Sequence, residues 1–466
     1  MKNVAAKLFL QRAQSLDGAR HSCRFNVRIA GAQEISSPLA VCALKWSRIR
    51  NRAALKGHVV AFSFLLALLL VVSGCAHFSS AKFEPPKQFI VFNLGGNSPE
   101  KDFAAVSEMF TNVAPSPVGI GVAGIFSYFA APPAQVEGDL KNFLRLAEQY
   151  EIPIVVQLDG EAWWDARPDL WNWWDASRPG FNPSNRFNVE WSGWQPTDAM
   201  RIAWRNWGSI TRVLPPPNLM SPTYRAAWRK EMQRLVPVVV AWQKNLPADK
   251  RWLLIGVKVG WESSIGVNAW YYPDGNKLAD LPHSSDPTNN LLAKFTHARG
   301  VAQIGYASVK TAGLRREGEI TEADLTEIVR RHLEDMCRTA AELGVRREKL
   351  FTHVGGWKDD ELLYGAATNV FSCPGWSFYR HADDARQDTG VQSVLAQSDA
   401  KYWAAVEWSQ RGKNEFEPWR SALANTLADP RCRFLCIYNW GNVQRNRTAQ
   451  AAVRRVIADA QAAAKN

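Results

Sequence analysis

Short apolar runs alternate with amphipathic segments along residues 88–466. The runs predict strands at 89–93, 118–129, 152–164, the first half of 251–273, 349–356, 373–379, 402–409 and 433–442. Apolar residues at helical spacing predict helices at 99–113, 136–151, 222–244, 291–311, 321–344 and 448–464. The strand runs are mostly apolar and do not alternate strictly, which indicates a parallel sheet covered by helices.

The number of strands and the chain length favour an α/β fold of the (β/α)₈ type, a TIM barrel, over an open sheet. No glycine-rich phosphate loop follows any run, which argues against dinucleotide binding. Long loops follow the third and fourth strands, on the side where barrel active sites lie. The unit between strands five and six is too short for a convincing helix.

The fourth strand ends on a carboxylate. Counting by twos places Glu262 on one face with Lys258, and Ile255, Val257 and Trp261 on the other. A face with glycines, Lys258 and Glu262 fits a barrel lumen better than a contact with helices. Gln157 and Asp159 share a face of strand three and are expected to reach Lys258, because a buried lysine needs a polar partner.

The seventh strand repeats this pattern. Glu407 stands near its end and, by the same count, shares a face with Ala405 and Trp403. Two strands of one barrel that both end on glutamate predict two carboxylates across the barrel mouth. At a separation of about 5 Å, such a pair suits acetal cleavage, which needs a proton donor and a nucleophile.

The pair resembles the clan of (β/α)₈ retaining glycoside hydrolases that carries its catalytic glutamates on strands four and seven. The resemblance implies that Glu262 is the acid/base and Glu407 the nucleophile, with no metal or cofactor, and that a carbohydrate is the partner. The clan usually has asparagine before the acid/base, where this chain has Trp261. Two alternatives stay open: a pair formed by Glu262 with Glu161 or Asp159, and a non-catalytic glycan-binding barrel.

Aromatic residues supply further candidates for substrate binding, because flat rings stack on sugar faces. The chain has 21 tryptophans, many of them in the loops after strands three and four. Those nearest to strand ends are Trp163, Trp164, Trp261, Trp270, Trp376, Trp408 and Trp440, with Tyr271 beside them. Polar candidates at strand ends are Asn93, Asp159, Glu161, His353, Tyr379 and Asn439, and Tyr379 is placed to hydrogen-bond a nucleophile.

The first 74 residues have the composition of a secretory leader. They carry eleven Lys/Arg against two Asp/Glu, so they hold +9 of the net charge of +12 and leave no case for nucleic-acid binding. An apolar run from Val59 to Val72 is short for a membrane span and suits a signal peptide. Residues 1–50 are unusually long for such a leader, which is consistent with a start codon placed too far upstream.

The motif "VSGC" resembles a bacterial lipobox, which implies lipidation, including palmitate, at Cys75. The expected product is an exported lipoprotein, anchored to a bacterial membrane in the periplasm or at the cell surface. Residues 75–87 then form a tether, and 88–466 form a single catalytic barrel. Of the other cysteines (Cys337, Cys373, Cys432 and Cys436), the last two lie too far apart on one strand to pair.

Overall fold

The computed structural model describes residues 86–95, 99–110, 116–161, 163–201, 203–206, 210–265, 269–270, 303–355, 362–379 and 381–465. The predicted leader, Cys75 and most of the tether lie outside these residues. Among the helices of the described part, none is both long and apolar enough to cross a bilayer.

Eight parallel strands form the main sheet. They are β1 (Gln88–Asn93), β2 (Val118–Ser127), β3 (Ile154–Asp159), β6 (Leu254–Val259), β8 (Leu350–Phe351), β9 (Gly375–Phe378), β10 (Trp403–Trp408) and β11 (Cys432–Ile437). Their order is β8-β6-β3-β2-β1-β11-β10-β9, and parallel bridges from Phe351 to Cys373 and from Val354 to Trp376 join the two edge strands. The sheet is therefore a nearly closed TIM barrel, and the predicted fold class is confirmed.

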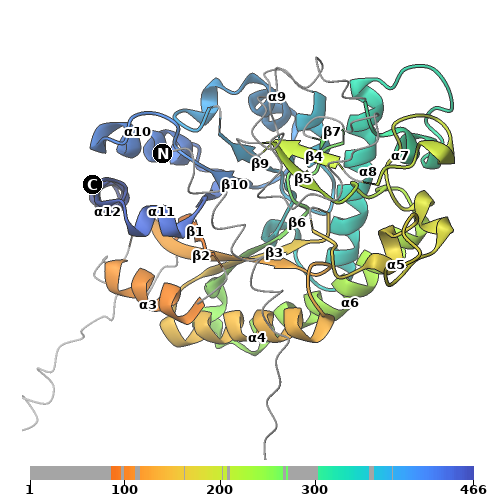
Figure 1. Ribbon diagram of the computed structural model, residues 1–466. Coiled ribbons are helices and arrows are strands. Elements are labelled where there is room, and N and C mark those ends of the chain that lie inside the picture. Colours follow the sequence, from red (N-terminus) through yellow and green to blue (C-terminus); the bar gives the residue numbers. More distant parts are fainter. Residues whose placement is uncertain are drawn as a thin grey trace, which may run out of the picture. The chain divides into compact units, whose positions relative to one another are not determined.

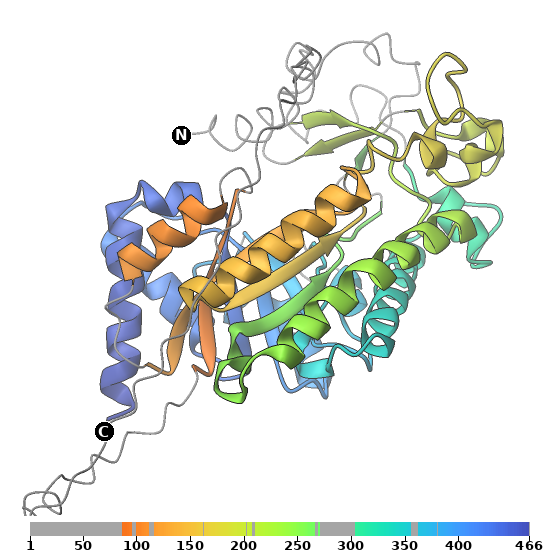
Figure 2. The same cartoon turned by 90° about the horizontal axis from the view of Figure 1, so that it is seen from below.

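Helices cover the outside of the barrel (Figure 1). The longer ones are α3 (Pro99–Phe110), α4 (Pro133–Tyr150), α6 (Pro222–Asn245), α8 (Glu322–Glu342), α9 (Thr389–Gln397), α10 (Phe416–Leu427) and α12 (Arg447–Ala463). Figure 2 shows α4 and α6 running along the outside of the strands. Helices α9 and α10 were not among the predicted helices, and only Tyr306–Thr311 (α7) of the segment predicted at 291–311 is described as helix.

Short helices fill several connections. They are α5 (Pro168–Trp171), α11 (Trp440–Gln444) and the 3₁₀ helices η1 (Pro183–Phe187), η2 (Pro196–Asp198), η3 (Ala248–Leu253), η8 (Arg347–Lys349), η9 (Leu362–Ala367) and η10 (Ala385–Gln387). Element η9 lies between β8 and β9, where the sequence was too short for a full helix.

Local sequence signals explain both ends of α8. The Thr321 hydroxyl accepts a hydrogen bond from the Asp324 amide at 3.2 Å, and the Asp324 carboxylate accepts one from the Thr321 amide at 2.9 Å. This reciprocal capping box satisfies amides that have no partner within the helix. The helix ends just before Gly344, whose φ of 103° favours glycine. Both predicted boundaries are confirmed within two residues.

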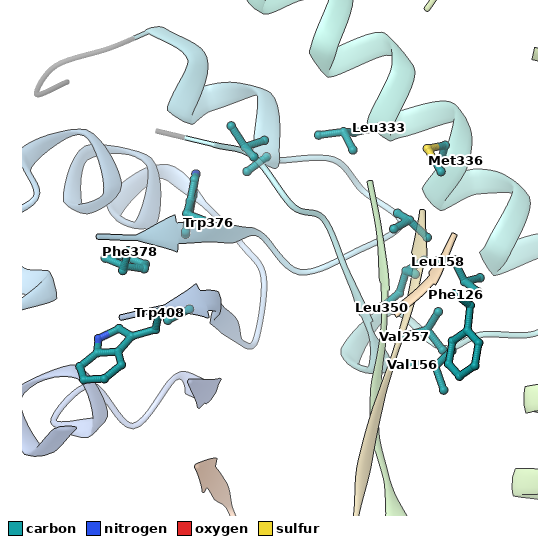
Figure 3. Packing of buried hydrophobic residues seen from close by; sticks show 14 of the residues in the cluster. Phe126, Val156, Leu158, Val257, Leu333, Met336, Leu350, Trp376, Phe378 and Trp408 are labelled. Carbon is teal, nitrogen blue, oxygen red and sulfur yellow. The ribbon is translucent and has the colours of Figure 1, made fainter. Parts of the chain in front are cut away.

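The barrel wall separates two apolar cores. The inner core fills the lumen with residues from seven of the eight strands, among them Phe89, Val155, Phe351 and Phe434, and with Cys373, which precedes β9. The outer core lies between strands and helices. Figure 3 shows Phe126, Val156, Leu158 and Val257 from three neighbouring strands gathered together, with Leu333 and Met336 on α8 beside them. Burying such a side chain contributes roughly 1.5–3 kcal/mol, so the two cores hold the strand ends in place.

Two irregularities in strand pairing correct the side-chain faces predicted by counting. The β3–β6 register shifts after the Ile154–Leu254 pair, so Ile255 joins the inner core, although it was expected on the other face with Val257. The β10–β9 register shifts between Ala405 and Glu407. An extra residue in one strand breaks the strict alternation on which counting depends.

The shift in β10 decides where Glu407 points. Trp403 and Ala405, which were expected to share its face, lie in the outer core, while Ala404 and Val406 face the lumen. Glu407 pairs with Ser377 of β9 and its side chain turns to the lumen side. The predicted lumen position of Glu407 is thus correct, but the reason given by simple alternation is wrong.

The two long loops meet in a second, smaller sheet. Strands β4 (Ala203–Asn206) and β5 (Ile210–Val213) come from the loop after β3, and β7 (Ala269–Trp270) comes from the loop after β6. All pair antiparallel in the order β5-β4-β7, with Trp204 opposite Trp270. Figure 2 shows the β4–β5 hairpin beyond one end of the barrel. Both loops leave the carboxyl ends of their strands, where the polar side chains described next converge.

Candidate active site

Glu262 lies two residues beyond Gly260 in a tight turn after β6. Its φ of 44° is in the left-handed region, which costs a non-glycine residue roughly 1–2 kcal/mol. Ser263 holds this turn on both sides: its amide donates to the His353 carbonyl at 3.0 Å, and its hydroxyl donates to Glu161 Oε1 at 2.7 Å. The turn therefore aims the Glu262 side chain, which is only 3% exposed, into the barrel mouth.

Glu407 is fixed from the neighbouring strand β9. The Tyr379 hydroxyl donates a hydrogen bond to Glu407 Oε1. His353 Nε2 lies 3.8 Å from the other carboxylate oxygen. The side chain is 11% exposed and keeps its place because a tyrosine and a histidine flank its two oxygens.

Glu262 and Glu407 meet at the centre of the barrel mouth. One side-chain oxygen of each and one ring nitrogen of His353 all lie within 4.8 Å of one another. The Ser377 hydroxyl donates to Glu262 Oε1 at 3.0 Å. The sequence prediction that the two glutamates approach each other across the mouth agrees with this geometry.

Burial and charge shape the acid–base properties of this cluster. Burial raises the pKa of Glu407, while the hydrogen bond from Tyr379 and the charge of Lys258 oppose that rise. Burial, followed by the charge of Lys258, brings the pKa of His353 well below its usual value, so this imidazole is neutral. The pKa of Tyr379 is raised by burial and by both carboxylates, which keeps its hydroxyl proton available for donation.

Lys258 lies beneath the pair in the lumen and is almost fully buried. Burial lowers the pKa of its ammonium, and the charges of Glu407, Asp159 and Glu262 oppose that change. The Nζ atom lies 2.8 Å from His353 Nδ1 and 5.7 Å from the centre of the Trp261 ring. Gln157, an expected partner of Lys258, instead donates to Asn93 Oδ1 at 3.0 Å.

Asp159 and Glu161, the rival carboxylates, belong to a second cluster. Asp159 accepts from the Ser127 hydroxyl at 3.0 Å and from the Glu161 amide at 2.9 Å, and burial raises its pKa to about 6. Glu161 Oε1 contacts His332 Nε2 at 3.2 Å besides accepting from Ser263. Glu161 therefore supports the Glu262 turn from behind, between the strand ends and α8.

Four tryptophans predicted to contact ligand lie in the outer core. They are Trp164, Trp376, Trp408 and Trp440, each no more than 1% exposed. Trp376 and Trp408 donate from Nε1 to the carbonyls of Tyr364 and Ala382, and Trp440 packs on Phe92. All four side chains pack in the outer core between strands and helices, so the prediction of ligand contact is wrong for these four.

The remaining candidates lie in varied surroundings. Trp261 is buried beside Lys258, while Trp163 and Asn439 are half-buried at strand ends. Asn439 follows β11 through a cis peptide bond with Tyr438. The Trp270 side chain and Tyr271 lie outside the described residues.

Sequence reasoning missed two members of the site, Ser377 and Tyr438. Ser377 stands two residues before Tyr379 on β9, so alternation could have placed both on the lumen face. The Tyr438 amide donates to the carbonyl of Trp408, the residue after Glu407, at 2.8 Å, and burial and the charges of Glu407 and Glu262 raise the pKa of its hydroxyl. The four cysteines at 337, 373, 432 and 436 are buried and free.

The donor atoms of Glu262, His353 and Glu407 raise the question of a metal centre. Both imidazole nitrogens already have hydrogen-bond partners, because Nδ1 lies 2.8 Å from Lys258 Nζ and Nε2 lies 2.8 Å from the Ser377 hydroxyl. A histidine binds a metal ion through a free lone pair. We therefore assign the cluster as a hydrogen-bonded carboxylate pair.

No protein-family model matches the chain, and no curated protein sequence matches it. Solved structures with a similar fold include the β-amylase catalytic domain from Paenibacillus polymyxa, at 9% identity, a TM-score of 0.42 and coverage of 81% of this chain and 100% of that one. An exo-β-1,4-mannosidase from Opitutaceae bacterium strain TAV5 has 8% identity and a TM-score of 0.40, and the match covers 82% of this chain and 60% of that one. A family 5 glycoside hydrolase from Prevotella bryantii B14 has 7% identity and a TM-score of 0.38, and the match covers 79% of this chain and 95% of that one. Likenesses of this size concern the fold, so the function rests on the chemistry of the site.

Proposed function

We propose that the protein is a glycoside hydrolase that acts on an oligo- or polysaccharide by a retaining mechanism. The observation that carries this proposal is the approach of a Glu262 oxygen to within 4.8 Å of a Glu407 oxygen at the carboxyl ends of β6 and β10. Retaining enzymes hold their two carboxyl groups about 5–5.5 Å apart, whereas inverting enzymes leave room for a water molecule at about 6.5–9.5 Å.

The surroundings of the two carboxylates favour distinct roles. Tyr379 donates a hydrogen bond to Glu407, and the Lys258 ammonium acts on it through its charge. Both favour the ionised form that a nucleophile needs. We therefore assign Glu407 as the nucleophile, and the resemblance to the two-glutamate clan assigns Glu262 as the acid/base.

In the first step, a Glu407 oxygen attacks the anomeric carbon while Glu262 gives its proton to the glycosidic oxygen. The glycosidic bond breaks, the leaving sugar departs as an alcohol, and a glycosyl ester on Glu407 forms. In the second step, Glu262, now ionised, takes a proton from water, whose oxygen attacks the same carbon. The ester bond breaks, and both carboxyl groups return to their starting states.

The test begins with hydrolysis of a panel of nitrophenyl glycosides and soluble polysaccharides. On any substrate found, Glu262→Gln should lower kcat by about 10²–10⁴-fold, and Glu407→Ala should lower it further. Glu161→Gln is the matched variant for the alternative pair of Glu262 with Glu161, and it should keep turnover if Glu262 and Glu407 are the catalytic pair. If Glu161→Gln abolishes turnover while Glu262→Gln or Glu407→Ala keeps it, the proposed pair is wrong.

The stereochemistry tests the mechanism separately. NMR of the first product should show the anomer of the substrate. Azide added to Glu407→Ala should attack the anomeric carbon in the space left by the carboxylate and give a glycosyl azide of the opposite anomer. A first product of inverted configuration would contradict the retaining mechanism. Glycan binding with no turnover in the wild type would favour a binding protein instead.

Export and lipid anchoring at Cys75 belong to the same proposal, because a polysaccharide substrate lies outside the cytoplasm. The support is the charged and apolar leader followed by "VSGC". Labelled palmitate should enter the wild-type protein and not Cys75→Ala, and only the wild type should sediment with membranes. Equal labelling of both proteins would contradict lipidation at this residue.

A further inference from the structure

The buried lysine under the carboxylate pair has a defined route to Glu262. Lys258 Nζ lies 2.8 Å from His353 Nδ1, His353 Nε2 lies 2.8 Å from Ser377 Oγ, and Ser377 Oγ lies 3.0 Å from Glu262 Oε1. All four side chains are buried, and they come from β6, the segment after β8, β9 and the turn after β6. The three contacts form one continuous chain across the barrel mouth.

We infer that Lys258 is a positioning residue that sets the direction of this hydrogen-bond chain, so that His353 carries its proton on Nε2 and the Ser377 hydroxyl donates to Glu262 Oε1. The inference rests on the proposed function for its catalytic meaning, but the direction of the chain is a property of the free protein.

The direction follows from the chemistry of the donors. An ammonium group has three donors and no acceptor, so His353 Nδ1 must accept from Lys258 and Nε2 must carry the imidazole proton. Nε2 then donates to the Ser377 oxygen, and the single hydroxyl proton of Ser377 is left to donate to Glu262 Oε1. A neutral lysine would leave the direction open.

The groups around Lys258 support its charged state. Burial lowers the pKa of Lys258, and the charges of Glu407 on β10, Asp159 on β3 and Glu262 in the turn after β6 oppose that change, while the neutral Cys436 thiol lies on β11. His353 Nδ1 and the Trp261 ring also lie beside it. An ammonium among several carboxylates replaces water as the source of compensating charge, which a buried cation requires.

The direction has a consequence for the reaction. Because Ser377 donates to Oε1, it favours the ionised form of Glu262, which takes a proton from water in the second step of the reaction. Because His353 Nε2 carries a proton, the imidazole is not a base that competes with Glu407, although it lies 3.8 Å away. Lys258 thus touches no reacting atom and acts through His353 and Ser377.

The direct test is ¹⁵N NMR of the histidines in the substrate-free protein. We expect His353 to show an unprotonated Nδ1 and a protonated Nε2 throughout pH 6–8, and Lys258→Met to give a mixture of tautomers. A wild-type His353 with its proton on Nδ1 would overturn the inference. This experiment needs no substrate, so it stands even if the glycosidase proposal fails.

The second arm is the pH dependence of kcat/KM. The basic limb of the profile reports Glu262, which must be protonated, and the acidic limb reports Glu407, which must be ionised. Ser377→Ala removes one donor to ionised Glu262, so the basic limb should move about one unit to higher pH while the acidic limb stays in place. Lys258→Met removes a charge that acts on both carboxylates, so both limbs should move to higher pH. Ser377→Thr, which keeps the hydroxyl, should restore the wild-type profile.

Lys349→Met is the matched control, because Lys349 is also buried but donates to the Leu254 carbonyl. It should lower stability without moving either limb. If Lys258→Met does not fold, the wild-type tautomer of His353 and the pH profile of Ser377→Ala still test the direction of the hydrogen-bond chain. If Ser377→Ala lowers the melting temperature but leaves both limbs unchanged, the chain has a structural role only and the inference is wrong.

Discussion

The hydrogen bond from Tyr379 to Glu407 allows a quantitative prediction for Tyr379→Phe. This substitution keeps the ring and removes only the hydroxyl that donates to Glu407 Oε1. A hydrogen bond to a charged, buried group contributes about 1.5–3 kcal/mol. One pKa unit corresponds to about 1.36 kcal/mol, so the pKa of Glu407 should rise by about 1–2 units in the variant.

The sign follows from the ionisation that the reaction needs. The hydrogen bond favours ionised Glu407 and lowers its pKa, so its removal makes the carboxylate take up a proton at higher pH. The acidic limb of kcat/KM, which reports the free enzyme, should therefore move upward by about 1–2 units. Well below that limb, Tyr379→Phe should lose about 10–100-fold in kcat/KM, and it should recover most of this loss at higher pH.

The assay is kcat/KM from pH 4 to 10 on a confirmed substrate, with carboxyl ¹³C NMR titration of glutamate-labelled protein alongside. Tyr438→Phe is the matched control, because Tyr438 lies near the same carboxylates and the described residues show no hydrogen bond from it to Glu407. A uniform fall in kcat/KM at every pH, with the acidic limb in place, would refute the reasoning and assign Tyr379 to substrate binding.

Three further predictions concern stability and metal dependence. Burial raises the pKa of Glu190 to about 7 from an ordinary value of 4.5. Between these pH values the folded state holds a proton that the unfolded state has lost. The free energy of unfolding should therefore fall by about 3 kcal/mol from pH 4.5 to 7. Urea unfolding at several pH values should show a flatter dependence for Glu190→Gln, and an equal slope in both proteins would contradict this account. Trp408→Phe should lower the free energy of unfolding in urea by about 1–3 kcal/mol, because the Ala382 carbonyl loses its donor, and should leave KM unchanged. A raised KM with unchanged stability would show that Trp408 contacts the substrate. Dialysis against EDTA should leave activity intact, whereas loss of activity with recovery on adding a divalent cation would show that the cluster of Glu262, His353 and Glu407 works as a metal centre.

Local sequence patterns were sufficient for the architecture. Eight apolar runs, the first five of them separated by amphipathic helices, predicted the barrel, since a strand buried on both faces needs apolar residues throughout. The capping box at Thr321 and the glycine at 344 placed the ends of α8 because both act within a few residues. Glutamates at the ends of two runs marked the mouth of the barrel, since parallel strands bring their carboxyl ends to one side.

The tertiary structure decided what depends on neighbouring strands. The register shifts that turn Ile255 and Glu407 to the lumen arise from pairing with β3 and β9, and no spacing within one strand encodes them. The same holds for Trp376 and Trp408, whose burial depends on the helices that cover them. In the chain from Lys258 to Glu262, the contact between Ser377 and Glu262 joins residues 115 positions apart. The sequence alone determined which strands carry the chemistry, because alternation and composition are local; only packing determined which side chains meet, because contacts across a barrel depend on register.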